Sequence, residues 1–279
     1  MQKPKRVLHS KNPFKQKKEK AEWETKLRND MLDGMAILKI CKCELPEEVL
    51  KLDLSGKGYQ QIYKNDLKYF NNILEIDLTD NKISLSDIDF LLSLTKINMQ
   101  SNGINSLIIR PNTFPNLQCL DISFNNFNSE ELASLEKVPR LKSLSMVGNN
   151  LSNMPDEVKK LASLELLNIS HNKFSSDENA ACLWEQMASF HNLKELDLSN
   201  NELRGIHTEK LIAGDFSNLE LLDFRANKVD DQMKLICARN FTSLKFLYVT
   251  NNSFTELAYD FLTSELQNRV GAEVRFFID

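Results

Sequence analysis

The amino-acid sequence predicts an α/β solenoid, with a curved parallel sheet on the concave face and short helices or 3₁₀ turns on the convex face. Two observations lead to this fold class. A pattern of leucines ending in asparagine returns eight times along the chain. Several segments between the copies have the apolar spacing of short helices.

The repeated pattern has the form L-x-x-L-x-L-x-x-N-x-L. In residues 193–203, LKELDLSNNEL, the closing asparagine is Asn201. A degenerate first copy at residues 49–59 has Lys57 in its place. Successive asparagines are 21 to 29 residues apart. The eight that fit the pattern are Asn81, Asn102, Asn125, Asn149, Asn172, Asn201, Asn227 and Asn252.

A frame of this form and period resembles the leucine-rich repeat, and the match covers residues 49–254. The two inner leucines of each copy are expected to point into the solenoid from a short strand. After the strand the chain turns inward, and the asparagine amide is expected to satisfy the buried backbone groups there. We therefore predict that the asparagines are structural and bind no ligand.

The segments between the strands differ in length and predicted structure. The longest contains SSDENAACLWEQMASFHNL, in which Ala181, Trp184, Met187 and Ala188 share one helical face. This segment is predicted to be a true helix. NSEELASLEKVPRL and MPDEVKKLASL are predicted to form short helices or 3₁₀ turns, bounded by prolines.

Both ends of a solenoid need caps, because an open end exposes core and a strand edge. The sequence predicts an amphipathic helix over residues 20–43, with Trp23, Leu27, Met31 and Ile37 as its apolar contacts. A helix over 256–270 and a final strand in AEVRFFID are predicted to close the other end. The predicted domains are a basic arm (1–20), a helical cap (21–48), the repeats (49–255) and a C-terminal cap (256–279).

Composition excludes several protein classes. Apolar residues make up 42% and charged residues 27% of the 279 residues, as in ordinary globular proteins. No apolar run is long enough to span a membrane, and the N-terminus has no apolar region of a secretory signal. The five cysteines include no C-x-x-C pair. We therefore expect an intracellular protein with free thiols and no membrane segment.

The charge is unevenly distributed. The first 20 residues hold eight basic residues and one glutamate, a charge of +7, so the rest of the chain carries −4 − 7 = −11. This arm is expected to dock on an acidic surface, with tubulin favoured over nucleic acid. The alternative is a solvated, disordered tail. The basic residues are Lys3, Lys5, Arg6, Lys11, Lys15, Lys17, Lys18 and Lys20.

Catalytic and cofactor motifs are absent from the sequence. It has no phosphate-binding glycine loop, no dinucleotide fingerprint and no H-E-x-x-H. The four histidines are spread along the chain, and each is expected to be solvated or to have its hydrogen bonds made within the protein. Cys41 and Cys43 form the one close cysteine pair, for which buried capping thiols are favoured over a zinc or redox site. We predict a non-enzyme with no cofactor, no metal and no small-molecule substrate.

The strand residues between the core leucines are predicted to face the concave surface. Among them, Leu166, Leu221, Phe246 and Tyr248, with Arg225 nearby, form a partly apolar surface typical of an interface. We predict that these five residues bind a protein partner. The alternative is that the C-terminal cap covers Phe246 and Tyr248. The early concave face, with Glu75, Asp77 and Asp80, is predicted to be acidic.

A second, narrower resemblance covers residues 32–158. The order of three segments resembles that in the X-ray radiation resistance-associated family. They are LDGMAILKIC, the degenerate repeat and FPNLQCLDISFNNFNSEELASLEKVPRLKSLSMVGNNLSNMPDEV. That resemblance implies an intracellular interaction protein.

The sequence favours a protein–protein interaction scaffold in a larger assembly, cytoskeletal or axonemal. The expected location is cytoplasmic or cytoskeletal, with the cilium included and the nucleus as the alternative. Two other functions remain open. One is a nuclear or RNA-associated adaptor whose arm contacts phosphates. The other is a regulatory subunit that binds an enzyme such as a phosphatase on its concave face.

Overall fold

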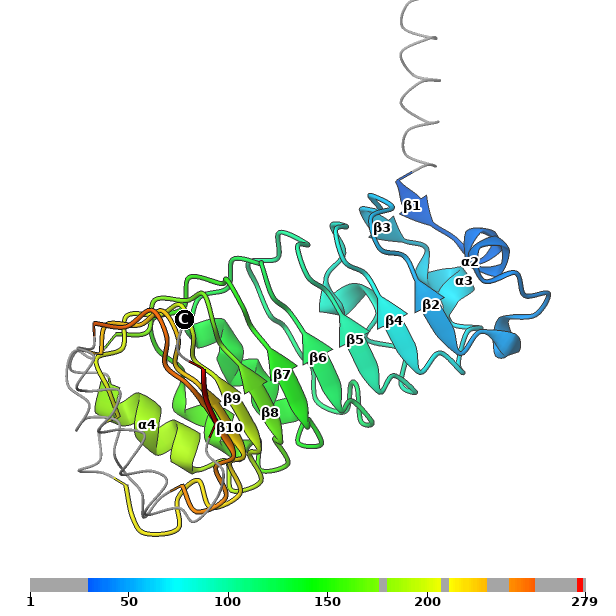
Figure 1. Ribbon diagram of the computed structural model, residues 1–279. Coiled ribbons are helices and arrows are strands. Elements are labelled where there is room, and N and C mark those ends of the chain that lie inside the picture. Colours follow the sequence, from blue (N-terminus) through cyan, green and yellow to red (C-terminus); the bar gives the residue numbers. More distant parts are fainter. Residues whose placement is uncertain (1–29, 176–179, 207–210, 230–240, 254–274, 278–279) are drawn as a thin grey trace, which may run out of the picture.

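A single long parallel sheet runs the length of the molecule (Figure 1). The computed structural model describes residues 30–175, 180–206, 211–229, 241–253 and 275–277. The strand order is β12-β11-β10-β9-β8-β7-β6-β5-β4-β2. These strands are β2 (Lys51–Asp53), β4 (Glu75–Asp77), β5 (Lys96–Asn98), β6 (Cys119–Asp121), β7 (Ser143–Ser145), β8 (Leu166–Asn168), β9 (Glu195–Asp197), β10 (Leu221–Asp223), β11 (Phe246–Tyr248) and β12 (Arg275–Phe277).

Neighbouring strands pair in strict register. Leu167 of β8 lies opposite Leu196 of β9, and Leu196 lies opposite Leu222 of β10. Residues alternate between the two faces of a strand, so in β2 and in each of β4 to β11 the middle residue points into the solenoid. Leu196 is fully buried, and Leu167 and Leu222 are each 1% exposed. The predicted fold class is confirmed, since each repeat contributes one strand and one layer of core.

The helical segments are short and lie behind the strands (Figure 1). NSEELASLEKVPRL and MPDEVKKLASL contain the 3₁₀ segments η3 and η4, as the sequence predicts. The true helix of the longest repeat is α4, in which Trp184 and Met187 are fully buried. The helical elements are α2 (Gly34–Cys41), η1 (Pro46–Glu48), α3 (Lys64–Leu67), η2 (Leu85–Asp87), η3 (Glu130–Lys137), η4 (Asp156–Lys160) and α4 (Ala180–Ala188).

The N-terminal cap differs from the predicted single helix over residues 20–43. Residues 20–29, with Trp23 and Leu27, lie outside the described residues. Met31 belongs to a strand, β1 (Met31–Leu32), which pairs with β3 (Gln61–Ile62). The helix begins only at Gly34, because the Asp33 carboxylate accepts a 2.8 Å hydrogen bond from the Ala36 N–H and caps it.

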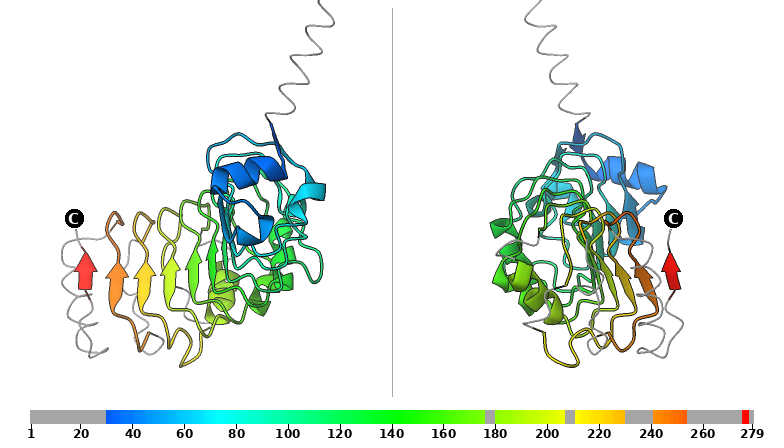
Figure 2. Two further views of the ribbon diagram at one scale, coloured as in Figure 1. Left: turned by 90° about the vertical axis from the view of Figure 1, so that its right-hand side faces the viewer. Right: turned by 60° about the vertical axis from the view of Figure 1, so that its left-hand side comes forward.

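The two ends of the sheet are built differently. Figure 2 shows the strands side by side, with α2 at the end opposite β12. In α2, Ile37 is fully buried as predicted. At the other end, β12 continues the sheet by pairing with β11 in register, Phe276 opposite Leu247. The predicted helix over 256–270 lies outside the described residues.

Candidate protein-binding face

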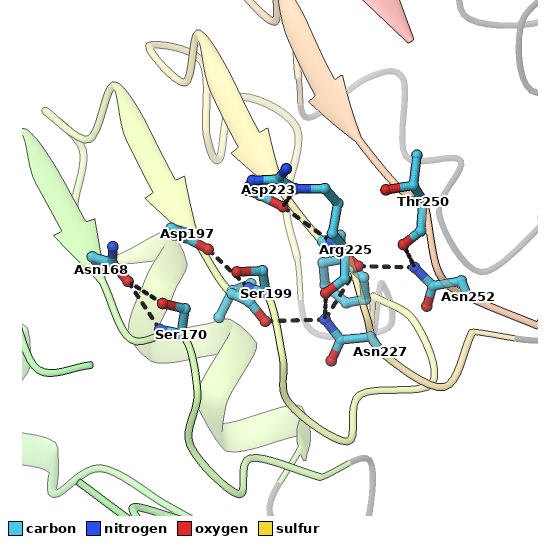
Figure 3. A network of polar contacts seen from close by, with 11 residues as sticks. Asn168, Ser170, Asp197, Ser199, Asp223, Arg225, Asn227, Thr250 and Asn252 are labelled. Atoms are coloured by element: carbon cyan, nitrogen blue, oxygen red, sulfur yellow. Dashed lines mark hydrogen bonds and ion pairs between the residues drawn. The ribbon is translucent and has the colours of Figure 1, made fainter. Parts of the chain in front are cut away.

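The pattern asparagines form a hydrogen-bonded column through the solenoid. Asn172 makes five such bonds: its Nδ2 donates to Met146, Ile169 and Ser170 carbonyls, and its Oδ1 accepts from the Asn149 and Leu151 N–H groups. In every one of the eight, Nδ2 reaches a carbonyl of the preceding repeat. The asparagines therefore join repeats, as the sequence predicts, and Figure 3 shows this for Asn227 and Asn252.

The last residue of most strands has a structural role that sequence reasoning missed. Asp197 Oδ1 accepts a 2.9 Å hydrogen bond from the Ser199 N–H (Figure 3). Six other strands end on a residue that accepts the same hydrogen bond from the N–H two residues later: Asp53, Asp77, Asn98, Asp121, Asn168 and Asp223. These Asp and Asn side chains thus fix the turns that follow these seven strands. The recurrence of Asp or Asn four residues before the pattern asparagine was the signal for it.

The structure brings together four of the five predicted partner-binding residues. Leu221 and Phe246 face each other on β10 and β11, and Tyr248 follows on β11. The Arg225 guanidinium lies 5.1 Å from the centre of the Tyr248 ring. Leu221, Phe246 and Tyr248 are half-buried, and Arg225 is exposed. We call these four residues the aromatic cluster.

Leu166, the fifth predicted residue, is not part of this cluster. It lies on β8, and Glu195 of β9 separates it from Leu221. Leu166 is half-buried beside Ser143 on β7. The apolar surface is therefore divided in two by a carboxylate.

Arg225 is held in place by the Asp223 carboxylate and the Tyr248 ring. Its Nε lies 3.0 Å from both carboxylate oxygens of Asp223 (Figure 3). Asp223 is only 4% exposed, and its carboxylate raises the pKa of the Arg225 guanidinium. The arginine stays charged and fixed beside the Tyr248 ring, so little rotamer freedom is lost when it meets a partner.

The early sheet face is of mixed charge, which corrects the prediction of an acidic face. Lys51 pairs with Glu75 across 2.7 Å, and Lys96 flanks Glu75 on the other side. The hydrogen bond from Lys51 lowers the pKa of Glu75. A pocket of about 260 Å³ lies among these residues and Asp77. A partner would meet both signs of charge here.

A ladder of alternating charges follows the edge where the later strands begin. Glu165 lies between Lys142 at 3.2 Å and Lys194 at 2.7 Å, and further along Glu220 pairs with Lys245 at 2.7 Å. All five are partly exposed and belong to consecutive repeats. We call them the edge ladder.

Cysteines, histidines and carboxylates that could react or bind a metal form no such site in the described part of the chain. Cys41 and Cys43 are half-buried rather than the buried thiols that the sequence favours, and burial and the neighbouring Cys43 raise the pKa of Cys41. His171 and His191 are exposed, as expected. No group of three or more His, Cys, Asp or Glu that could hold a metal occurs there. None of its helices has both the length and the apolar character to cross a membrane.

The basic arm, from Lys3 to Lys20, lies outside the described residues.

Comparisons with known proteins agree with this architecture. Residues 112–177 and 192–214 match two models of the leucine-rich repeat family. X-ray radiation resistance-associated protein 1 of Mus musculus is 25% identical over 112 residues, which is 40% of this chain. The chain spans only 14% of that protein's length.

Solved structures show the same fold. Internalin C2 from Listeria monocytogenes superposes with a TM-score of 0.51 and 16% identity, over 88% of this chain and 92% of the internalin chain. The functional domain of InlJ from the same organism gives a TM-score of 0.53 and 17% identity, over 83% and 53% of the two chains. This chain therefore has the leucine-rich repeat fold, with two segments that match the models of that family and one that resembles the X-ray radiation resistance-associated family.

Proposed function

We propose that this protein is a non-enzymatic scaffold that binds protein partners through its sheet face. The observation that carries the proposal is the aromatic cluster, in which half-buried Phe246 and Tyr248 lie beside a fixed Arg225. Aromatic residues and arginine dominate the binding energy of protein interfaces. Leucine-rich repeats are in general interaction modules, which agrees with this use of the face.

We further propose that the partners belong to a larger intracellular assembly, cytoskeletal or axonemal, in the cytoplasm or the cilium, with the nucleus as the alternative. The charge distribution supports this: an arm of +7 precedes a body of −11. The arm docks on an acidic surface, for which tubulin is favoured over nucleic acid. Repulsion between that surface and the acidic body leaves the sheet face turned outward to its own partner.

The aromatic cluster is tested by changing Phe246 and Tyr248 together to serine in the full chain. Cross-linking mass spectrometry of the native complex reads the result, with Lys245 as the nearest reporter lysine. We expect the cross-links from Lys245 to a partner protein to disappear. A matched control is Ile108→Ser, which alters a side chain that is 60% exposed outside the sheet face. Unchanged cross-links in the folded double variant would refute the cluster as the binding site.

The arm is tested by reversing four of its charges, with Lys11, Lys15, Lys17 and Lys18 changed to glutamate. We expect the unaltered chain to sediment with microtubules and the variant to remain in solution. Binding through surface charges weakens as salt is added, so the sedimented fraction should fall with ionic strength. Equal sedimentation of both chains would exclude the arm as the contact, and salt-sensitive binding to RNA alone would favour the nuclear adaptor.

A further inference from the structure

Phe124 is an exposed aromatic residue in an unfavourable backbone conformation. It follows β6 with a φ of 54°, and 54% of its surface is exposed. The left-handed region is a true outlier for a bulky residue. Other repeats fill the same position with polar or small residues: Asp80, Ser101, Gly148, His171, Asn200, Ala226 and Asn251. Neither core packing nor local backbone preference explains a phenylalanine here, and such outliers gather at functional sites.

The next repeat makes room for this ring. Gly148 occupies the equivalent position after β7, and a Cβ built on it would lie 2.8 Å from Phe124 Cδ1. The Phe124 N–H donates to the Val147 carbonyl at 2.7 Å, which fixes the phenylalanine backbone to the same repeat. The ring therefore lies across Gly148, held at its base and open to solvent above.

The sheet face has an uncharged stretch next to Phe124, which we call the gap. The outward strand residues of β7 and β8 are Ser143, Ser145, Leu166 and Asn168, and none carries a charge. On one side of this gap Asp121 ends β6, and on the other Asp197 ends β9. Over β2 to β11 the first and last strand residues hold seven carboxylates against two lysines.

The nearest cations neutralise these carboxylates only in part. Lys142 and Lys194 lie on the edge ladder, and Glu165 pairs with both. Arg225 pairs with Asp223, and its charge also attracts the Asp197 carboxylate. Asp121 and Asp197 accept hydrogen bonds from neutral groups, the amide of Gln100 and backbone N–H groups. A partner that approaches the gap therefore meets an uncharged surface, with the exposed Phe124 ring at its border and a carboxylate on each side.

We propose that the gap beside Phe124 binds an extended segment of a partner protein in which one apolar side chain lies between two basic ones. The apolar side chain packs on the Phe124 ring and the small residues of β7. The basic side chains meet Asp121 and Asp197. The proposal rests on the proposed function of the sheet face and names a second part of that face, together with the chemistry of its ligand.

The spacing of the strands sets the spacing of the ligand. From β6 to β9 there are three strand steps, about 14 Å. An extended chain rises about 3.3 Å per residue, so about four residues span this distance. Alternate residues of an extended segment face the same side. The predicted ligand is therefore basic at one position, apolar two residues later and basic two residues after that.

Selection of random peptides, displayed on phage, on the immobilised full chain tests this proposal. We expect enrichment of peptides with the basic, apolar, basic spacing, and weaker retention at high ionic strength. Phe124→Ala should lower the affinity of an enriched peptide about tenfold or more. Ile108→Ala, a change to an apolar side chain that is 60% exposed elsewhere, should leave the affinity unchanged.

Two further variants test the charges without disturbing the turns. Asp197→Asn keeps the oxygen that holds the turn, as Asn168 does in the preceding repeat. It should weaken peptide binding, whereas Asp53→Asn on distant β2 should not. Selection of acidic or uncharged peptides, no enrichment, or equal binding by the Phe124→Ala variant would overturn the inference. If the Phe246 and Tyr248 double variant alone lost its partner, the proposed function would stand and this inference would fail.

Discussion

At the scale of the residue, two asparagines in the same pattern position have unequal partners. Asn172 makes five hydrogen bonds that join two repeats. Asn149 uses only its Nδ2, toward the Ile122 and Val147 carbonyls, and its buried Oδ1 has no partner. The pattern makes the two residues equivalent, but the hydrogen bonds do not.

Replacement of Asn172 by alanine is expected to lower the free energy of unfolding by about 3 kcal/mol, because several buried backbone groups lose their partners. Asn149→Ala serves as the matched variant and should cost less, by about 1 kcal/mol or more. Urea unfolding measures both. Equal losses would mean that the asparagine contributes through its shape and not through its hydrogen bonds.

Gly148 offers a second comparison between matched residues. Gly148 and Gly103 both have a φ of 64°, but a Cβ on Gly103 would meet nothing within 4 Å. Both alanine variants carry the strain of the left-handed conformation, about 1–2 kcal/mol. Gly148→Ala should cost more, since its Cβ also displaces the Phe124 ring. In a Phe124→Ala background the two glycine variants should become equal in thermal melts, and a persistent difference would contradict the packing described.

At the scale of the element, each strand is anchored by its central apolar residue. Leu196 is fully buried in β9 and faces Leu167 and Leu222 in the neighbouring strands. Three-residue strands have few hydrogen bonds of their own, so burial of this side chain provides most of their stability.

Leu196→Ala is therefore expected to destabilise the protein by about 2–5 kcal/mol, through lost burial and a residual cavity. Leu74→Ala, at a site that is 41% exposed, is the control and should have a much smaller effect. Thermal melting followed by circular dichroism would distinguish them. An unchanged melting temperature for Leu196→Ala would show that the residue is not core.

The edge ladder predicts a pH dependence that can be assigned to one residue. Hydrogen bonds from Lys194 and Lys142 lower the pKa of Glu165 from its ordinary value of 4.5. The stabilisation by these ion pairs is present above pH 4.5 and is lost as pH falls through the lowered folded-state pKa. Changing both lysines to methionine should raise the pKa of Glu165, measured by carbon NMR of its carboxylate. Lys228→Met, which removes the partner of Glu202 instead, should leave Glu165 unchanged.

Sequence reasoning succeeded where the pattern is set by packing. The leucine and asparagine frame located β2 and every strand from β4 to β11, because burial leaves few residue types at those positions. It failed at Met31, where the apolar spacing suits a helix but Asp33 caps the helix two residues later. It gave no prediction for Phe124, because the residue lies outside the leucine and asparagine frame. Its exposure and its contact with Gly148 are visible only in the structure.

At the scale of the whole molecule, contacts run from each repeat to its neighbours. The strand pairs from β2 to β11 of the ten-stranded sheet join successive repeats, and the asparagine bonds do the same. Stability should therefore spread along the solenoid by neighbouring contacts and weaken with distance.

Leu144→Ala, in the middle of the sheet, tests this spread. Hydrogen exchange should rise most in β6, β7 and β8 and least in β2 and β10, read by mass spectrometry of peptides from each strand. Leu144 is 1% exposed, so its removal disturbs the core and not the surface. A uniform rise along all strands would instead indicate one global unfolding unit.

The in-register joints between repeats also bear on the ancestry of the chain. The pattern asparagines lie 21 to 29 residues apart, yet β2 and every strand from β4 to β11 meet their neighbours residue for residue. The length differences fall between one pattern asparagine and the next strand along the chain, and they leave the strand pairing unchanged. Duplication or loss of a whole repeat in the gene would therefore yield a molecule whose remaining strands still pair in register. Such an event would lengthen or shorten the sheet face by one strand. The ligand preference of the face would then change through the outward residues of that strand.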